Sequence, residues 1–349
     1  MTDLERLEAC VPLLLHWHRQ NRRILPWRVD PTPYSVWVSE IMLQQTRIEA
    51  AIPYYARFMA RLPTVEALAA VPEEELLKLW EGLGYYSRAR NLKKAAGQIV
   101  SDWGGQLPRT AEELRTLPGI GDYTAGAIAS IACGQPSPAV DGNVLRLVLR
   151  LTASREDALS PKTRGRITDL LRQVYPSGQE AGLLTEGLME LGETVCLPLG
   201  KVWCDACPLA ALCLARERGE ASRLPVRNAK KARRIEERTV LLLTCGEKYA
   251  LRRREDRGLL AGLWEFPNRE GWQSAEELRV WLEKLGAAPL DLEPCGEARH
   301  LFSHVEWHMR GFRVRCDREA EAFQWQTAAE IRQSYAIPSA FRFYLKQLG

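Results

Sequence analysis

The sequence has no apolar run that approaches the ~20 residues of a membrane-spanning helix, so nothing in it indicates a membrane protein. Its first twenty residues, MTDLERLEACVPLLLHWHRQ, carry acidic side chains early and contain only a short apolar stretch, so they do not resemble a signal peptide. A large net charge is also missing, because the formal value is only +4 at pH 7. Any affinity for nucleic acid must therefore come from local basic patches.

The cysteines do not follow the pattern of a secreted disulfide framework. There are nine of them, an odd number, and four crowd into the pattern Cys196-x7-Cys204-x2-Cys207-x5-Cys213. Four thiolates in one short segment indicate an iron–sulfur or zinc site inside a cell. A structural zinc site more often uses two C-x2-C pairs and only one is present here, so a [4Fe–4S] cluster with a structural role is favoured.

Length and composition predict two soluble domains, because the chain has 349 residues of which 46% are apolar. Residues 1–222 show helical periodicity, with helices expected over 4–20, 34–59 and 64–79. A basic stretch over 223–236 has no apolar periodicity and is predicted to be a linker, with possible contacts to DNA phosphates. Residues 237–349 then alternate strand patterns with one amphipathic helix at 275–285, which predicts an α+β domain.

One turn between two helical segments, Leu117-Pro-Gly-Ile-Gly121, has the chemistry of a phosphate-binding hairpin. Gly119 and Gly121 allow positive φ and a close backbone approach, and the following helix N-terminus offers free N–H groups to an anion. Such a turn suits a sequence-independent grip on DNA phosphates. An ordinary helix–turn–helix connection would have the same residues.

Two carboxylates are the candidate acid–base groups. Glu40 is surrounded by Trp37, Val38, Ile41 and Leu43, so we expect partial burial and a raised pKa, which suits a general acid. Asp141 precedes a flexible glycine at the start of a new apolar helix. The alternatives are an exposed Glu40 on a polar helix face and an Asp141 that only caps its helix.

Aromatic and basic residues are interleaved at two further places. Trp27 and Arg28 could stack on a base or pair with a phosphate, and the glycine-rich turn around Tyr85 could insert an aromatic ring between bases. Gln45 has the donors and acceptors needed to contact base edges. The alternative is that Trp27 and Tyr85 fill the core while Arg28 and Gln45 are solvated.

Together these separated motifs resemble adenine DNA glycosylases of the MutY type, in the helix-hairpin-helix and endonuclease III superfamily, over nearly the whole chain. The resemblance implies a mainly α helix-hairpin-helix glycosylase domain with an iron–sulfur cluster loop at 196–213, followed by an α+β Nudix-like lesion-recognition domain. It also implies base-excision repair, in which adenine mispaired with 8-oxoguanine or guanine in duplex DNA is flipped out and removed by hydrolysis of its N-glycosidic bond.

The resemblance also assigns expected roles to residues. Glu40 is the expected general acid and Asp141 the group that stabilises the oxocarbenium-like state. Asn143 and Tyr123 are expected to support Asp141 and the reacting sugar. Residues expected to contact the substrate, by lining the adenine pocket, entering the stack or recognising 8-oxoguanine, are Arg23, Trp27, Arg28, Gln45, Thr46, Tyr85, Glu186, Phe302, Ser303 and His304.

Three departures from related patterns sharpen the prediction. Tyr123 stands where the endonuclease III branch has a Schiff-base lysine, so we expect a monofunctional enzyme without lyase activity. The stretch Gly258–Pro267 is similar to a Nudix domain, but the acidic signature R-E-x-x-E-E is missing, which predicts binding and not pyrophosphate hydrolysis. The first cysteine spacing is x7, whereas the family normally has x6.

The remaining expectations concern context and alternatives. The resemblance implies a monomer that acts on double-stranded DNA in the cytoplasm, associated with the nucleoid; the sequence identifies no protein partner. An endonuclease III-like glycosylase and AP lyase is the alternative enzyme. A cluster-bearing DNA-binding protein without chemistry is the alternative from another class, although such a binder would need neither Glu40 nor Asp141.

Overall fold

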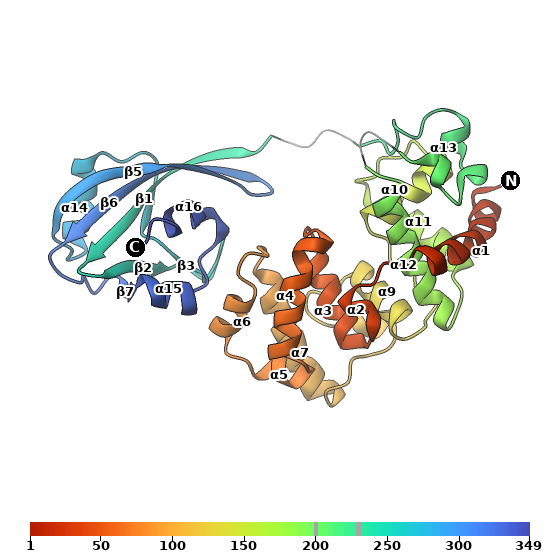
Figure 1. Ribbon diagram of the computed structural model, residues 1–349, viewed down its shortest axis with the longest axis horizontal. Helices are drawn as coiled ribbons and strands as arrows, with labels where there is room; N and C mark the ends of the chain where they lie inside the picture. Colours follow the sequence, from red (N-terminus) through yellow and green to blue (C-terminus); the bar gives the residue numbers. More distant parts are fainter. Residues whose placement is uncertain (199–201, 228–231) are drawn as a thin grey trace. The chain divides into compact units, whose positions relative to one another are not determined.

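The computed structural model describes residues 1–198, 202–227 and 232–349 of the chain. Its residues divide into two compact units (Figure 1). The first unit comprises Met1–Ala70 and Asn91–Ala229, and the second comprises Val71–Arg90 and Lys230–Gly349. Each unit has its own core and is described by itself. None of the helices in the described parts of the chain is both long and apolar enough to cross a membrane.

The first unit is built from helices, as the periodicity predicts. The predicted helix over 4–20 is confirmed as α1, which begins with a capping box in which Thr2 accepts from the N–H of Glu5 and the Glu5 side chain accepts from the N–H of Thr2. The helices that belong wholly to this unit are α1 (Asp3–Asn21), α2 (Pro26–Val29), α3 (Pro33–Leu43), α4 (Ile48–Arg61), α5 (Val65–Ala70), α8 (Ala111–Leu114), α9 (Asp122–Ile131), α10 (Gly142–Leu151), α11 (Pro161–Val174), α12 (Gln179–Thr194) and α13 (Leu214–Glu217).

Two long helices expected from the sequence are each broken in the structure. The segment 34–59 is divided into α3 and α4 by a turn at Gln44–Arg47, where Gln45 has a φ of 61°. The segment 64–79 is divided into α5 and α6 (Glu73–Leu79), since Pro72 has no N–H to donate within a continuous helix. Helix α7 (Ser87–Trp103) extends across the division between the two units.

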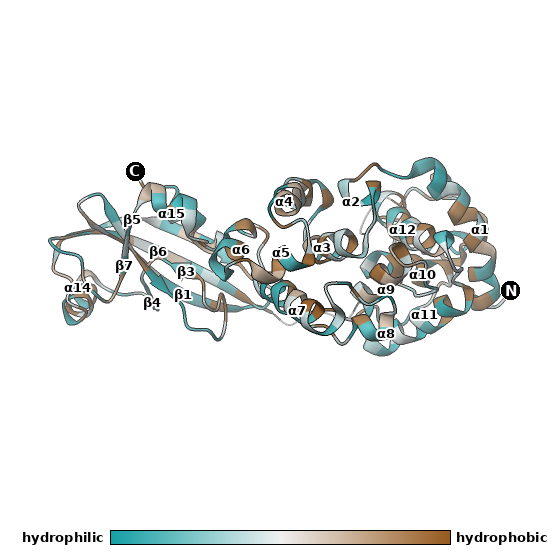
Figure 2. Ribbon diagram, turned by 90° about the horizontal axis from the view of Figure 1, so that it is seen from below, coloured by the Kyte–Doolittle hydropathy of each residue, from teal (hydrophilic) through white to brown (hydrophobic). Residues whose placement is uncertain are grey.

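The centre of the first unit is packed closely because α9 carries small residues. An added Cβ on Gly126 would lie 2.3 Å from the carbonyl oxygen of Pro138, so the chain ahead of Asp141 can approach α9 only at a glycine. On the next helix, Val144, Val148 and Leu149 are fully buried in the main apolar cluster. Figure 2 shows apolar colouring on α9 and α10, whereas polar colouring is more frequent on α11. This packing fixes the ends of α9 and α10 that carry Tyr123 and Asp141.

The second unit contains a mixed sheet with the strand order β3-β2-β1-β6-β5, in which β4 also pairs with β1 and β7 with β2. Strands β1 and β6 are parallel, and the other pairings are antiparallel. The strands are β1 (Arg234–Cys245), β2 (Lys248–Arg253), β3 (Trp264–Glu265), β4 (Asn268–Glu270), β5 (Pro289–Leu301), β6 (Val305–Cys316) and β7 (Gln324–Thr327).

Both faces of this sheet are covered, which explains the unbroken apolar run at the centre of β1. Val240 and Leu242 lie in one buried cluster with Phe341 and Tyr344, while Leu241 and Leu243 lie in another with α14 (Ala275–Lys284). Figure 1 shows α14 and α16 (Arg342–Leu345) on opposite sides of the strands. The helix predicted at 275–285 is therefore confirmed as α14, and the α+β class of this unit is confirmed as well.

The observed boundaries differ from those predicted. The linker predicted over 223–236 is too long at its C-terminal end, because β1 begins at Arg234 and pairs with β6 from its first residue. Two of the linker's lysines, Lys230 and Lys231, lie outside the described residues. The segment Val71–Arg90, which we had placed within 1–222, belongs to the second unit: Lys78 Nζ donates to the carbonyl of Tyr335, and the Ile337 N–H donates to Glu81.

Candidate active site

A cavity of about 170 Å³ lies in the first unit where α2, α3, α9, α10 and α12 meet. Each long helix contributes one face, as in the i, i+3, i+7 spacing of Glu186, Met189 and Glu193 on α12. Eight of the lining positions are candidate residues of the sequence analysis, and they come from five separate stretches. The lining residues are Leu25, Trp27, Arg28, Val36, Ser39, Glu40, Leu43, Thr46, Ile48, Tyr123, Ile131, Asp141, Asn143, Glu186, Met189 and Glu193.

Glu40 lies in this cavity on α3 and is 5% exposed, so its expected burial is confirmed and the alternative of an exposed polar-face residue is wrong. Burial raises the pKa of Glu40 to about 7, and the negative charge of Asp141 acts in the same direction. A hydrogen bond from the Tyr123 hydroxyl to Glu40 Oε2 opposes this rise. A carboxyl group with a pKa near 7 can hold a proton and release it close to neutral pH.

Asp141 is the N-cap of α10 and also lines the cavity. Its Oδ1 accepts from the backbone N–H groups of Asn143 (2.8 Å) and Val144 (2.7 Å), and its Oδ2 accepts from Asn143 Nδ2 (2.8 Å). Burial raises the pKa of Asp141 above its usual value, although these hydrogen bonds hold the rise back. Asp141 can therefore cap α10 and still serve the chemistry expected of it, since the capping hydrogen bonds fix its carboxylate at the cavity wall.

Asn143 is itself held in place from behind. Arg146 Nη2 donates to Asn143 Oδ1 (2.9 Å) and to the carbonyl of Gly192 (2.6 Å), while Arg146 Nε donates to the carbonyl of Cys196 (2.8 Å). Arg146 is only 3% exposed, although sequence reasoning did not mark it. One buried guanidinium therefore joins the support of Asp141 to the backbone of the first cysteine in the cluster motif.

The wall of the cavity formed by α12 is a network of ion pairs around buried carboxylates. Glu186 Oε2 accepts from Arg22 Nε (2.8 Å) and from His18 Nε2 (3.1 Å), and Arg28 Nε lies 3.5 Å from Glu186 Oε1. Burial alone would raise the pKa of Glu186, but these hydrogen bonds and charges lower it below the usual value. Glu186 is therefore a fixed carboxylate, in contrast to Glu40.

Trp27 and Arg28 occupy the cavity wall, and Thr46 lies at its edge. Trp27 is buried with its ring 5.3 Å from that of Tyr55, so it fills an edge of the core and also lines the cavity. Arg28 is largely buried and its Nη2 lies 2.8 Å from Glu190 Oε2, which rules out the solvated alternative. Both residues follow Pro26, which begins the short helix α2.

Arg23 is placed differently from our expectation. Among the described residues, those that line the cavity do not include Arg23, whose guanidinium instead pairs with Glu190 and with Glu193 (2.6 Å from Nη2 to Oε2). Sequence reasoning missed both of these acids, as well as His18 and Arg22. The signal available for them was the spacing of Glu186, Glu190 and Glu193, which puts three carboxylates on one side of α12.

The hairpin predicted to bind phosphate is present between α8 and α9. Gly119 has a φ of 79°, and an added Cβ would lie 2.7 Å from the Cβ of Asn91, so only glycine fits there. Gly121 is the N-cap of α9 and has open space around its Cα. The backbone N–H groups at the start of α9 therefore remain accessible to an anion at the position that the sequence predicted.

A second cavity, of about 490 Å³, lies within the second unit. Tyr85 is 47% exposed with a φ of 47°, and its hydroxyl lies 2.8 Å from Ser303 Oγ. Phe302 packs edge-on against His300 (4.5 Å between centroids) and Trp307 (4.9 Å). His304 is exposed beside them. Tyr85 and the loop 302–304, predicted from distant stretches, thus line the same cavity.

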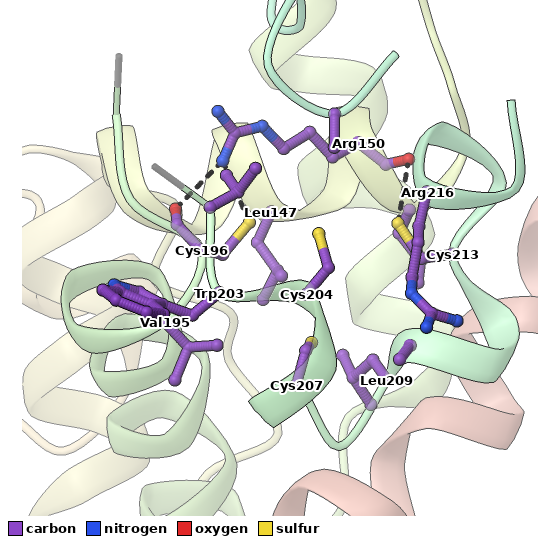
Figure 3. A pocket seen from close by; sticks show the side chains of 14 residues that line it. Leu147, Arg150, Val195, Cys196, Trp203, Cys204, Cys207, Leu209, Cys213 and Arg216 are labelled. Carbon is purple, nitrogen blue, oxygen red and sulfur yellow. Dashed lines mark hydrogen bonds between the residues drawn. The ribbon is translucent and has the colours of Figure 1, made fainter. Parts of the chain in front are cut away.

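The four cysteines of the predicted cluster motif surround one cavity of the first unit (Figure 3). None forms a disulfide, and Arg150 Nη1 donates to Cys196 Sγ (3.2 Å) and to the carbonyl of Leu197 (2.8 Å). The donor set of four thiols around one enclosed space fits a cluster. In the described part of the chain, no three Cys, His, Asp or Glu side chains are arranged to hold a single metal ion. Part of the longer Cys196–Cys204 spacing, 199–201, is not described.

The fold and the cavity define a class of DNA repair protein. Residues 38–173 match the HhH-GPD superfamily of base excision DNA repair proteins, and residues 239–347 match the NUDIX domain. The chain is similar in structure to a thermostable thymine-DNA glycosylase, with 27% identity and a TM-score of 0.56, over 61% of this chain and 98% of that one. An endonuclease III trapped as a covalent intermediate on DNA matches with 25% identity and a TM-score of 0.53, over 63% of this chain and 99% of that one.

Curated relatives narrow this class to one family. The adenine DNA glycosylase of Rattus norvegicus is 36% identical over an alignment that covers 98% of this chain and 79% of the relative. The adenine DNA glycosylase of Buchnera aphidicola subsp. Acyrthosiphon pisum is 31% identical, covering 89% of this chain and 88% of the relative. The chain belongs to the adenine DNA glycosylase family, as its motifs had indicated.

Proposed function

We propose that this protein removes adenine mispaired with 8-oxoguanine, or with guanine, from double-stranded DNA during base-excision repair. The observation that carries the proposal is the pairing of two buried carboxylates with different environments in one cavity, Glu40 with a pKa near 7 and Asp141 held by three hydrogen bonds. A base can reach such a cavity only after it has been flipped out of the duplex.

Glu40 would act as the general acid. At neutral pH a large fraction of Glu40 carries a proton, which it can transfer to a ring nitrogen of the flipped adenine. Protonation makes the base a better leaving group, so the N-glycosidic bond can break. The Tyr123 hydroxyl, which donates to Glu40 Oε2, then stabilises the carboxylate that the proton transfer produces.

Asp141 would stabilise the positive charge that develops on the sugar. Its two oxygens are fixed by the N-terminus of α10 and by Asn143, so the carboxylate needs no reorganisation as the charge forms. Water then adds to the sugar, which completes a hydrolysis. Tyr123 cannot form a Schiff base with the sugar, so the enzyme is proposed to be monofunctional, without lyase chemistry.

The remaining walls of the cavity would select adenine. Glu186 is an ionised acceptor that suits an exocyclic amine, and Trp27, Arg28 and Thr46 complete the lining around the base. Arg23 is proposed to act indirectly, by holding Glu190 and Glu193 in place through its hydrogen bonds to both carboxylates. Gln45, exposed on its turn at positive φ, is proposed to enter the base stack.

The second cavity would recognise the base opposite the adenine. Phe302 offers an aromatic face, Ser303 a hydroxyl and His304 an exposed ring, and all three are suited to a modified purine. Tyr85 belongs to the same cavity and is proposed to enter the stack beside the lesion. Gly119 and Gly121 would hold a DNA phosphate through the backbone of the hairpin.

Cys196, Cys204, Cys207 and Cys213 would hold a [4Fe–4S] cluster, which supplies a structural cross-link for the loop. Each thiolate would bind a separate iron, in agreement with thiols that surround a cavity without converging on a single ion. We expect Cys204→Ser to lower the iron and sulfide content of the purified protein and its absorbance in the visible range. Cys133→Ser, at a half-buried cysteine elsewhere, is the control.

The protein is also proposed to act as a monomer inside the cell, associated with the nucleoid. Nine cysteines without a disulfide support the reducing compartment.

The first test of the proposed activity uses a duplex with a single adenine opposite 8-oxoguanine. Half of each reaction receives hot alkali before strand lengths are measured. Strand cleavage only after alkali is the expected result, because removal of the base leaves the sugar intact. Cleavage without alkali would contradict the assignment of Tyr123, and binding without cleavage in either half would indicate a non-catalytic DNA-binding protein.

A further inference from the structure

His18 is a buried histidine that belongs to no motif recognised in the sequence. It lies on α1, is fully buried, and contacts α12 where Gly187 allows the two helices to approach. An added Cβ on Gly187 would lie 3.2 Å from the Cβ of His18 and 3.3 Å from Cγ of Leu14. The side chain is thus enclosed directly behind Glu186, which lines the cavity.

The His18 ring makes its hydrogen bond to Glu186 through only one of its two nitrogens. Its Nε2 lies 3.1 Å from Glu186 Oε2, whereas its buried Nδ1 has no hydrogen-bond partner within the described residues. Because an ionised carboxylate only accepts hydrogen bonds, the proton of this contact is on Nε2. A buried polar ring with one such contact is stabilised in the core chiefly by that contact.

The contact also restricts what Glu186 can do. Arg22 donates to both oxygens of Glu186, at 2.8 Å to Oε2 and 3.2 Å to Oε1, and His18 adds a second donor on Oε2. With both donors behind it, the carboxylate cannot rotate without losing a buried hydrogen bond. Its remaining lone pairs are then presented to the cavity as fixed acceptors.

We propose that His18 is a positioning residue for base selectivity, which acts through Glu186 to favour a purine with an exocyclic amine at the position that Glu186 contacts. The inference rests on the proposed contact between Glu186 and the flipped base. A base that lacks the amine gains nothing from the orientation of Glu186, so His18 affects the reaction of adenine and not that of the unsubstituted purine.

The test compares single-turnover base release from two duplexes, one with adenine and one with unsubstituted purine opposite 8-oxoguanine. We expect His18→Phe, which keeps much of the volume but removes the donor, to lower the ratio of the adenine rate to the purine rate about 10-fold. His18→Asn retains an amide that is too short to reach Glu186 and should lower the ratio similarly, which keeps the test valid if the Phe variant does not fold.

His18→Gln provides the matched rescue, because the amide nitrogen of Gln can occupy the place of Nε2. We expect this variant to retain the wild-type ratio within about 3-fold. His16→Phe, at an exposed histidine on the same helix, is the control and should change neither rate. Thermal unfolding of each variant separates a loss of stability from a loss of selectivity.

Several outcomes would overturn the inference. Equal losses on both duplexes would make His18 a merely structural residue, as would an unchanged ratio in the Phe and Asn variants. A Gln variant as impaired as the Phe variant would show that the donor is not what matters. If Glu186→Gln leaves the ratio unchanged, the proposed contact of Glu186 fails together with this inference. If the wild-type protein releases no adenine, the proposed function itself fails.

Discussion

The two cavities of this protein differ in how they hold their polar groups. In the first unit, Glu40 and Glu186 are almost completely buried, and arginines, a tyrosine hydroxyl and helix N–H groups surround the carboxylates. In the second unit, Tyr85, Ser303 and His304 are exposed on loops, and the hydroxyls of Tyr85 and Ser303 are hydrogen-bonded to each other. The first arrangement shifts pKa values, whereas the second offers surfaces for contact.

This difference follows from the work proposed for each cavity. Proton transfer and stabilisation of a sugar cation require a low-dielectric site with charges fixed in advance. Recognition of a base within DNA requires side chains that can be reached from outside the protein. Burial, more than residue type, separates the cavity proposed for catalysis from the cavity proposed for recognition.

The largest effect is expected from Glu40→Gln. Removal of the proposed general acid should slow adenine release about 10³-fold, because the amide cannot donate a catalytic proton. Binding to the mispaired duplex should stay within about 3-fold of wild type, since Glu40 is buried behind the cavity entrance. Single-turnover release and a binding titration measure the two quantities.

Glu283→Gln, at an exposed position on α14, is the control for this substitution. A parallel loss of binding and release in the Glu40 variant would assign Glu40 to the structure of the cavity and not to the chemistry.

The pH dependence of stability should change in the same variant. Between a pKa of 4.5 in the unfolded chain and about 7 in the folded protein, the folded state binds the additional proton on Glu40. The resulting contribution to the free energy of unfolding is fully present below pH 4.5 and is lost as pH rises through 7. This contribution is on the order of 3 kcal/mol. Denaturant unfolding followed by helical circular dichroism should therefore show a flatter pH profile for Glu40→Gln.

The matching experiment in the second unit is Ser303→Ala, which should leave the pH profile of stability unchanged. If the two variants flatten the pH profile of stability equally, the proposed difference between the two cavities, that only the first shifts pKa values by burial, is wrong.

Ser303→Ala should instead affect the choice of the opposite base. We expect the preference for adenine opposite 8-oxoguanine over adenine opposite guanine to fall about 10-fold, because one hydrogen-bonding group at the recognition cavity is lost. Release from the duplex with guanine should stay near its wild-type rate. The ratio of the two single-turnover rates measures this effect, and a uniform decrease on both duplexes would contradict it.

The smallest effect is expected from Tyr123→Phe on the pH profile of adenine release. Release should fall as pH rises through about 7, since Glu40 must be protonated to act. The Tyr123 hydroxyl lowers the pKa of Glu40, so its removal should move this limb to higher pH by up to about one unit. Tyr249→Phe in the second unit is the control. A shift to lower pH would disprove the hydrogen bond's proposed effect.

Much of this architecture could be predicted from the sequence because its signals are local. The glycines of the hairpin, the cysteine spacing and the alternating strand residues each reflect the backbone conformation within a few positions. The breaks at Gln44–Arg47 and Pro72 were missed, because apolar periodicity continues on both sides of each turn. The early start of β1 was missed since pairing with β6, and not an apolar pattern, extends the strand to Arg234.

The candidate residues could be predicted where a motif marks them, as at Glu40, Asp141 and the loop 302–304. Their surroundings could not be, because His18, Arg22, Arg146 and Glu190 acquire their partners through contacts between distant helices. His18 and Glu186, for example, are 168 positions apart. Similarly, nothing local indicated that Arg23 would turn toward Glu190 and Glu193.

The sequence by itself determined the two-domain organisation, the hairpin, the candidate carboxylates and the family to which the chain belongs. Only the tertiary structure decided which carboxylates are buried, which of them accept a hydrogen bond from Tyr123 or pair with arginines, and which polar groups stay at the surface. The physical reason is that local sequence patterns set the conformation of the backbone. The pKa values and hydrogen bonds of a site depend on solvent exclusion and on neighbours that folding alone brings together.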